Sequence, residues 1–376
     1  VRRNTWADLD HDHQLVGTRL DGLFTGKIGG LDNRFLVGAD INRTDFKTSR
    51  NGFPAGTEAP VDAYDPPEVP LSSGTSVFKS PGRDVAIEQW SVFAENQLSL
   101  SSRFKLVGGV RHDQFKTDWI YYDQVGAPRE SRQHTFNSWR VGAVLDLTPE
   151  ATLYASYATA VEPGGSLVIL NRNQSQLDLT TAKQFEVGIK QGFWNGKAEW
   201  TAAAYDIQKR NVFVPDPARP TNRLPVGKQS SQGVELSLGL RPTTQWQVDG
   251  NFAYVHARYD EFSAGNPPVS LSGNVPRLVP QWTANLGVQY KPTAAWTLGA
   301  WGRHVDRAYI NDTNTLELPA YTTLDLSTNY RFSKAMDVGF RIRNATDALY
   351  AESAYGSTQA LIANPRTYEV SVRLKF

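Results

Sequence analysis

The stretch PRTYEVSVRLKF, residues 365–376, alternates strictly between apolar and polar side chains. Successive side chains of a β-strand point to opposite faces. The apolar face carries Tyr368, Val370, Val372, Leu374 and Phe376, and the polar face carries Thr367, Glu369, Ser371, Arg373 and Lys375. This segment therefore predicts a strand that separates an apolar environment from an aqueous one.

The same period of two recurs along the chain. Clear examples are KQFEVGIK (183–190), QGVELSLGL (232–240), PQWTANLGVQY (280–290) and YTTLDLSTNYRF (321–332). About fifteen segments match this alternation. We predict an all-β protein whose antiparallel strands follow one another in chain order. The residues expected on its apolar, lipid-facing side include Phe185, Val187, Leu236, Leu238, Val370 and Val372.

The connections between these strands alternate between short and long. The short ones are rich in Gly, Pro, Asn and Ser, as tight hairpins require. They are GLDN (30–33), SLSS (99–102), LTPE (147–150), FWNG (193–196), RPTT (241–244), KPTAA (291–295) and FSKA (332–335). The long ones cover roughly 49–85, 121–133, 163–179, 213–227, 262–276, 311–319 and 346–363. This alternation is typical of outer-membrane barrels, which have short periplasmic turns and long extracellular loops.

Aromatic residues often mark the ends of the apolar faces. They are Trp90, Trp139, Tyr254, Trp282, Tyr290, Trp296 and Tyr330. This placement is typical of the aromatic girdles at the two surfaces of a membrane. A soluble β-propeller or sandwich also contains short alternating strands and is the alternative fold. We predict a transmembrane antiparallel β-barrel.

Composition excludes several classes of function. The chain has 39 Lys and Arg residues against 38 Asp and Glu, a net charge of +1, which gives no basic excess for binding nucleic acid. It contains no cysteine, which excludes thiolate metal sites and a cysteine nucleophile. The signatures G-x-S-x-G and H-E-x-x-H are also absent, so nothing indicates an enzyme.

Several segments resemble TonB-dependent ferric-siderophore receptors, and they occur in that family's order. They are LYASYATAVEPGG (153–165), TAKQFEVGIKQGFWNGKAEWTAAAYDIQKRNV (181–212), QSSQGVELSLGLRPTTQWQV (229–248), IRNATDALYAESAYG (342–356) and the final strand. In the fourth segment, Asn344 and Asp347 resemble the family's motif at the exit of a strand. The combination is more specific than any one segment.

The resemblance implies a barrel of about twenty-two strands that encloses an N-terminal plug. No segment of residues 1–376 resembles the plug or the TonB box. An odd number of strands also cannot close the usual even-stranded bacterial barrel. We therefore interpret residues 1–376 as one partial barrel domain, the C-terminal fifteen or so strands of the larger barrel.

For the whole protein, the resemblance implies TonB-dependent uptake of a ferric siderophore across the bacterial outer membrane. The implied partners are the ferric siderophore, outer-membrane lipid and, through the N-terminal region, the TonB complex. A passive porin or an adhesive barrel is the alternative function within the same fold. A soluble β-propeller protein is the alternative outside it.

A ferric siderophore brings its own iron ligands, so we expect no cofactor and no metal site. The protein needs aromatic faces and arginines at the extracellular end of the lumen. Extending the inward-facing pattern gives the candidates Phe115, Trp119, Tyr121, Tyr205, Phe213, Trp301, Arg307 and Tyr309. The alternative for the aromatic ones is packing beneath a loop.

Two other groups of polar residues have simpler interpretations. His11-Asp12-His13 is expected to lie in a solvated loop, because no further metal ligands accompany it at a useful spacing. Inward charges such as Glu186, Asp325 and Arg341 are expected to hydrate the barrel wall and to pair with the plug, since barrel interiors are polar.

Overall fold

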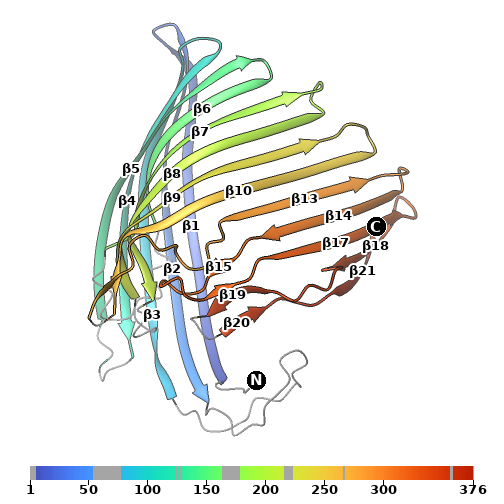
Figure 1. Ribbon diagram of the computed structural model, residues 1–376. Coiled ribbons are helices and arrows are strands. Elements are labelled where there is room, and N and C mark those ends of the chain that lie inside the picture. The colour runs from blue at the N-terminus through green and yellow to red at the C-terminus, as the bar shows by residue number, and fades with distance from the viewer. Residues whose placement is uncertain are drawn as a thin grey trace.

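The computed structural model describes residues 6–53, 78–122, 126, 129–162, 178–215, 223–265, 267–355 and 359–375. Regular structure in these segments consists of β-strands (Figure 1). Within the same segments, no helix has the length and apolar character needed to cross a membrane.

Fifteen strands form one antiparallel sheet, and each pairs with its neighbours in chain order (Figure 1). They are β1 (Trp6–Ile28), β2 (Leu31–Phe53), β3 (Phe78–Ser99), β4 (Phe104–Tyr121), β5 (Arg129–Thr148), β6 (Ala151–Val161), β7 (Thr181–Phe193), β8 (Ala198–Pro215), β9 (Arg223–Leu240), β10 (Trp246–Glu261), β13 (Trp282–Tyr290), β14 (Trp296–Val305), β17 (Tyr321–Arg331), β18 (Met336–Arg343) and β21 (Thr367–Leu374). The predicted strand number and order are confirmed.

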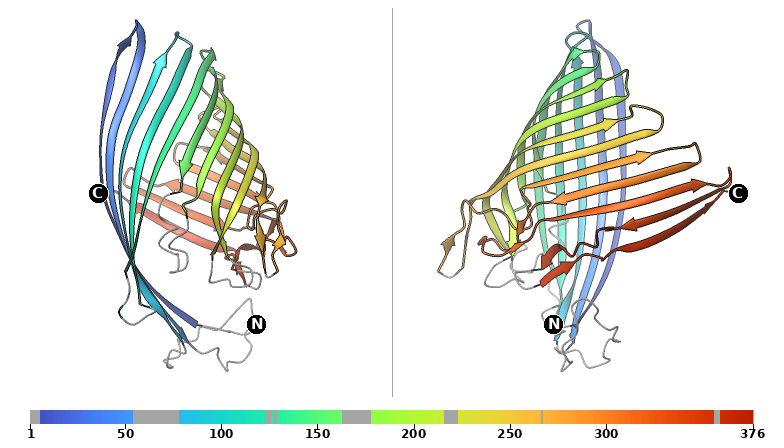
Figure 2. Two further views of the ribbon diagram at one scale, coloured as in Figure 1. Left: turned by 90° about the vertical axis from the view of Figure 1, so that its left-hand side faces the viewer. Right: turned by 45° about the vertical axis from the view of Figure 1, so that its right-hand side comes forward.

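The sheet curves around a central space, and among the described strands no pairing joins β1 to β21 (Figure 2). Short turns lie along one rim, and the described long connections after β10, β14 and β18 lie along the other (Figure 1). Three of the long connections contain small hairpins, β11–β12 (Ser263–Ala264, Val269–Ser270), β15–β16 (Ala308–Tyr309, Glu317–Leu318) and β19–β20 (Ala351–Tyr355, Gln359–Ile362).

The turn between β1 and β2 shows why the short connections are so tight. It consists of Gly29 and Gly30, whose φ angles are 57° and 84°. Positive φ at both central residues matches the twist of the flanking strands, and glycine adopts it without strain. The turn predicted at 30–33 is therefore wrong in position: it lies at 29–30, and Leu31 already begins β2.

The outer face of the sheet is apolar and exposed. All six residues predicted to face lipid lie on it, and their exposed fractions range from 38% for Val187 to 73% for Val370. A soluble core would bury these side chains. Their exposure confirms the predicted orientation. An apolar face of this kind is suited to contact with the hydrocarbon of a membrane.

Two aromatic levels border this apolar face. At the short-turn rim, Trp246 pairs with Tyr290, and their rings stack with centroids 4.4 Å apart. Nearer the other rim, Tyr254 pairs with Trp282. A strand needs about 9–11 residues to cross a membrane, and the span from Trp246 to Tyr254 is of this length. The predicted girdles are therefore present on these strands.

Large aromatic rings on the inner face lie across glycines of the neighbouring strand. The pairs are Phe93 with Gly38, Tyr154 with Gly188, Tyr205 with Gly233 and Trp301 with Gly287. A Cβ atom at Gly188 would lie 2.5 Å from the Tyr154 hydroxyl oxygen. Glycine in a strand often marks such a close approach, which allows a sheet to curve.

We expect Gly188→Val to destabilise the folded protein by about 1–3 kcal/mol, because the new side chain displaces the Tyr154 ring. Gly192→Val on the same face of β7 is the matched control, since nothing lies closer than 3.9 Å to a Cβ there. Urea unfolding measures both. Equal losses, or no recovery in the double variant Gly188→Val/Tyr154→Ala, would show that the contact is unimportant.

Candidate functional site

Four of the eight predicted site residues gather near the long-connection rim. Phe115, Trp119 and Tyr121 of β4 belong to one hydrophobic cluster with Leu179, and Phe213 of β8 packs against it. Trp119 is completely buried and Phe115 is 1% exposed. Leu179 belongs to the connection between β6 and β7, and it packs on this cluster. This arrangement matches the alternative given for the aromatic candidates, which was packing beneath a loop. Contact of these aromatic residues with a ligand stays a prediction.

The other four predicted residues lie elsewhere on the wall. Tyr205 lies across Gly233, and Trp301 lies on β14 across Gly287. Arg307 and Tyr309 belong to the connection between β14 and β17, where the Arg307 guanidinium lies 3.3 Å from the Glu317 carboxylate. The structure does not bring all eight residues into one pocket.

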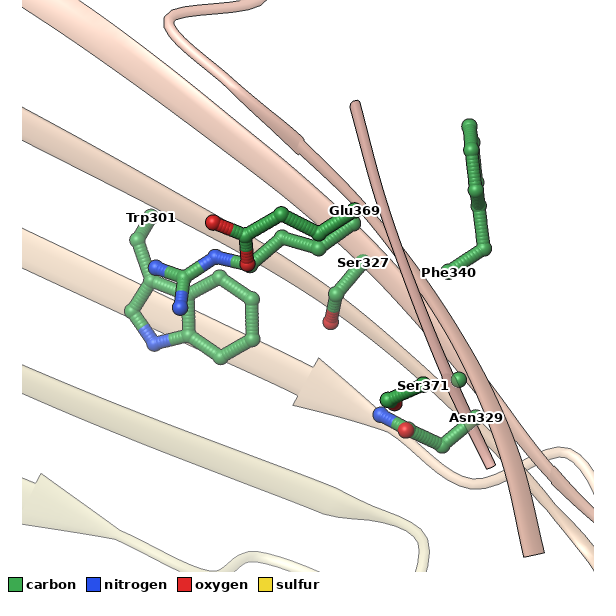
Figure 3. Close-up of a pocket in the computed structure, with 8 residues that line it drawn as sticks. Trp301, Ser327, Asn329, Phe340, Glu369 and Ser371 are labelled. Atoms are coloured by element: carbon green, nitrogen blue, oxygen red, sulfur yellow. The ribbon is translucent and has the colours of Figure 1, made fainter. Parts of the chain in front are cut away.

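Trp301 lines a cavity of about 520 Å³ on the inner face of the last strands. Figure 3 shows Trp301, Ser327, Asn329, Glu369 and Ser371 around this cavity, whereas Phe340 points away from them. Phe340 belongs to the outer face of β18, so its direction follows from the alternation of the strand. The side chains that face this cavity are mostly polar, with the Trp301 indole among them, as expected of a hydrated barrel interior.

Inward charges on these strands pair with one another along the wall. Arg341 donates to Asp325 across 2.8 Å, and its guanidinium lies 5.8 Å from the Trp301 ring centre. Arg343 donates to Glu369 across 2.5 Å. Charge-assisted bonds of this kind hold both partners in fixed positions. These charges are thus paired within the wall itself, in addition to the expected hydration and pairing with the plug.

A second cavity, of about 630 Å³, lies where β14, β17 and β18 meet the last long connection. We call it the rim cavity; its lining includes Arg303, Tyr321, Thr323, Asp325, Arg343, Asn344, Tyr350, Glu352, Leu361 and Ile362. Tyr321 and Tyr350 stack, with ring centroids 4.1 Å apart. Burial raises the pKa of the Tyr350 hydroxyl, Glu352 adds to this, and Arg303 opposes it. Tyr350 is therefore a protonated hydrogen-bond donor at neutral pH.

Asn344 fixes the wall of the rim cavity. It follows β18 directly, has a φ of 48°, and is 5% exposed. Its side-chain oxygen accepts from the Ala348 backbone nitrogen, and its amide nitrogen donates to the Ala348 carbonyl, each across 2.9 Å. The predicted role of Asn344 at the strand exit is confirmed.

Most residues of the rim cavity were not among the predicted site residues. The alternation does place Arg303 on the inward face of β14 together with Trp301, and it would also place Tyr321 on the inward face of β17. Tyr350 could not be placed in this way, because it lies in a connection without a strand pattern. Its position depends on how that connection folds back over the sheet.

The expectation for His11-Asp12-His13 was wrong in one respect. These residues lie within strand β1 and not in a loop. Both histidine rings contact Phe46 of β2, with ring centroids 5.4 Å and 5.9 Å away. β1 has 23 residues, more than the roughly 9–11 that a strand needs to cross a membrane, so it includes these positions. Among the described residues, no group of three or more His, Asp or Glu could hold a metal ion.

A curved antiparallel sheet with an apolar outer face, two aromatic girdles and a polar inner wall defines the wall of an outer-membrane β-barrel. Residues 2–345 match the family model described as TonB dependent receptor-like, beta-barrel. The chain therefore belongs to this family, whose members are transport receptors of the bacterial outer membrane.

Individual relatives agree with this assignment. The chain is 25% identical to the probable TonB-dependent siderophore receptor PiuA of Acinetobacter baumannii, over 94% of this chain and 51% of that protein. It is 26% identical to the metal-pseudopaline receptor CntO of Pseudomonas aeruginosa, over 96% of this chain and 51% of that protein. The chain thus spans about half the length of these relatives.

The fold is also found in solved structures. The crystal structure of PiuA from Acinetobacter baumannii superposes with a TM-score of 0.83 at 23% identity, covering 98% of this chain and 56% of that one. At this identity the likeness establishes the fold. It excludes the soluble β-propeller as the architecture of this chain.

Proposed function

We propose that the protein is an outer-membrane receptor for TonB-dependent uptake of a ferric siderophore, and that this chain supplies much of its barrel wall. The observation that carries the proposal is the family match over residues 2–345. Relatives named as siderophore and metal-pseudopaline receptors support it. In this proposal the TonB complex supplies the energy for uptake, and it contacts the N-terminal region of the receptor and not the sheet described here.

The inner wall suits a chelate better than a bare ion. Its cavities combine aromatic rings, arginines and hydroxyl groups, which recognise the organic surface of a ligand. We therefore propose that iron arrives already bound by the siderophore and that the protein supplies no cofactor. A passive porin would not need stacked tyrosines or a preorganised set of arginines at the rim.

The test of the proposed function is a binding panel on the receptor in its full natural length. We expect micromolar or tighter binding of at least one ferric chelate and no binding of cobalamin or a maltooligosaccharide. Isothermal titration calorimetry measures the affinity. Binding of cobalamin or the sugar without any ferric chelate would refute the siderophore assignment and leave the barrel intact.

For the predicted site residues, we expect Trp119→Ala and Tyr309→Ala each to weaken chelate binding by about 1–3 kcal/mol, as loss of an aromatic anchor does. Trp194→Ala, in a short turn at the opposite rim, is the control because that ring is 59% exposed. Trp119 is buried, so thermal unfolding of each variant is measured alongside. If both variants bind as tightly as the wild type, these residues are not part of the site.

A further inference from the structure

The rim cavity contains an arginine without an acidic partner. Arg341 donates to Asp325 and Arg343 donates to Glu369, so these inward charges are matched. Arg303 makes no ion pair with any residue that the structure describes. Its guanidinium is therefore the unmatched positive charge of this cavity.

The neighbours of Arg303 favour a ligand with oxygen acceptors. Tyr350 is protonated and can donate a hydrogen bond, and its ring is held by the stack with Tyr321. Thr323 lies directly opposite Arg303 in the sheet. A guanidinium presents a rigid fork of N–H groups that matches the two oxygens of a carboxylate.

Glu352 limits which ligand can enter. Its carboxylate also lines the cavity, so an additional negative group beside it would be repelled. A hydroxyl or an amino group, in contrast, can donate to Glu352. The charges thus favour a carboxylate at Arg303 with a hydroxyl or amino group close to it.

We propose that the rim cavity binds a hydroxycarboxylate or aminocarboxylate group of the metal chelate, with Arg303 as the residue that selects for the carboxylate. This inference rests on the proposed receptor function and names the class of chelate that it takes up. A volume of about 630 Å³ is large enough for such a group, since small-molecule sites usually measure about 300–1,000 Å³. The cavity also lies at the long-connection rim, on the extracellular side of the barrel.

The first experiment compares ferric citrate with ferrioxamine B, a hydroxamate chelate without a free carboxylate, on the full-length receptor. Arg303→Gln should weaken ferric citrate binding by roughly 10- to 100-fold, because it removes a charge-assisted contact. It should leave ferrioxamine B binding unchanged. Arg331→Gln, at the opposite rim, is the matched control and should change neither. Equal losses for both chelates, or no loss for ferric citrate, would overturn the proposal.

The second experiment measures the chemical reactivity of the Arg303 side chain and does not depend on transport. Phenylglyoxal modifies accessible arginines, and mass spectrometry measures modification of the peptide that contains Arg303. Citrate alone should protect Arg303 and leave Arg331 reactive. Protection of Arg303 before any ligand is added would mean that another segment of the receptor already pairs with it, which overturns the proposal.

The two experiments separate the failure of each inference. If the receptor binds ferrioxamine B but not ferric citrate, and citrate does not protect Arg303, the carboxylate site is wrong and the receptor function stands. If neither chelate binds but citrate protects Arg303, the site stands and the siderophore assignment is wrong for these chelates.

Discussion

Replacing Leu238 with arginine is expected to destabilise the folded barrel by about 2–4 kcal/mol, the cost of a lipid-facing charge at the middle of the bilayer. Leu238 faces outward on β9 and pairs with Gly250. Gly250 lies midway along β10 between Trp246 and Tyr254, which belong to the two aromatic girdles. From this midplane position, an arginine side chain cannot reach either membrane interface, so its charge stays in the hydrocarbon.

Ser237→Arg is the matched control for this substitution. Ser237 precedes Leu238 on β9, faces the polar interior and pairs with Asn251. A charge there stays hydrated, so we expect a loss within about 1 kcal/mol. Urea unfolding of the receptor in lipid vesicles measures both variants. Equal destabilisation would show that the apolar face does not contact lipid.

The sheet could be predicted from the sequence because two independent patterns agree. Alternation assigned Val370 and Val372 to the outer face, and short Gly- and Asn-containing turns such as FWNG (193–196) placed the hairpins to within a residue or two. The curvature of the sheet could not be predicted in this way. It depends on contacts between strands, such as Tyr154 over Gly188, which a pattern along one strand does not contain.

The candidate site was less predictable for the same reason. Alternation correctly placed Trp119 and Trp301 on the inner face, where the structure has both. It could not show that Leu179, in a distant connection, covers the cluster around Trp119. Arg303 lacks an acidic partner because the nearby carboxylate of Asp325 accepts a hydrogen bond from Arg341. Both features depend on tertiary contacts, which a pattern along one strand does not contain.

Produced by itself, the 376-residue chain is expected not to form a closed, heat-resistant barrel. In the described sheet, β1 and β21 each have a neighbour on one side only. Every unpaired N–H or C=O group that such an edge exposes to hydrocarbon costs about several kcal/mol. β21 also carries the exposed apolar side chains of Val370 and Val372. Moving this edge strand into water would therefore expose these side chains to water, which is unfavourable.

The measurement is migration of unheated samples in SDS gels, where a closed barrel stays folded and runs faster than the boiled protein. The full-length receptor is the control and should show the shift, whereas the 376-residue chain should not. Because open edges can also pair between copies, cross-linking distinguishes a monomer from an oligomer. A heat-resistant monomer of the chain alone would contradict this prediction, since it would require β1 to pair with β21.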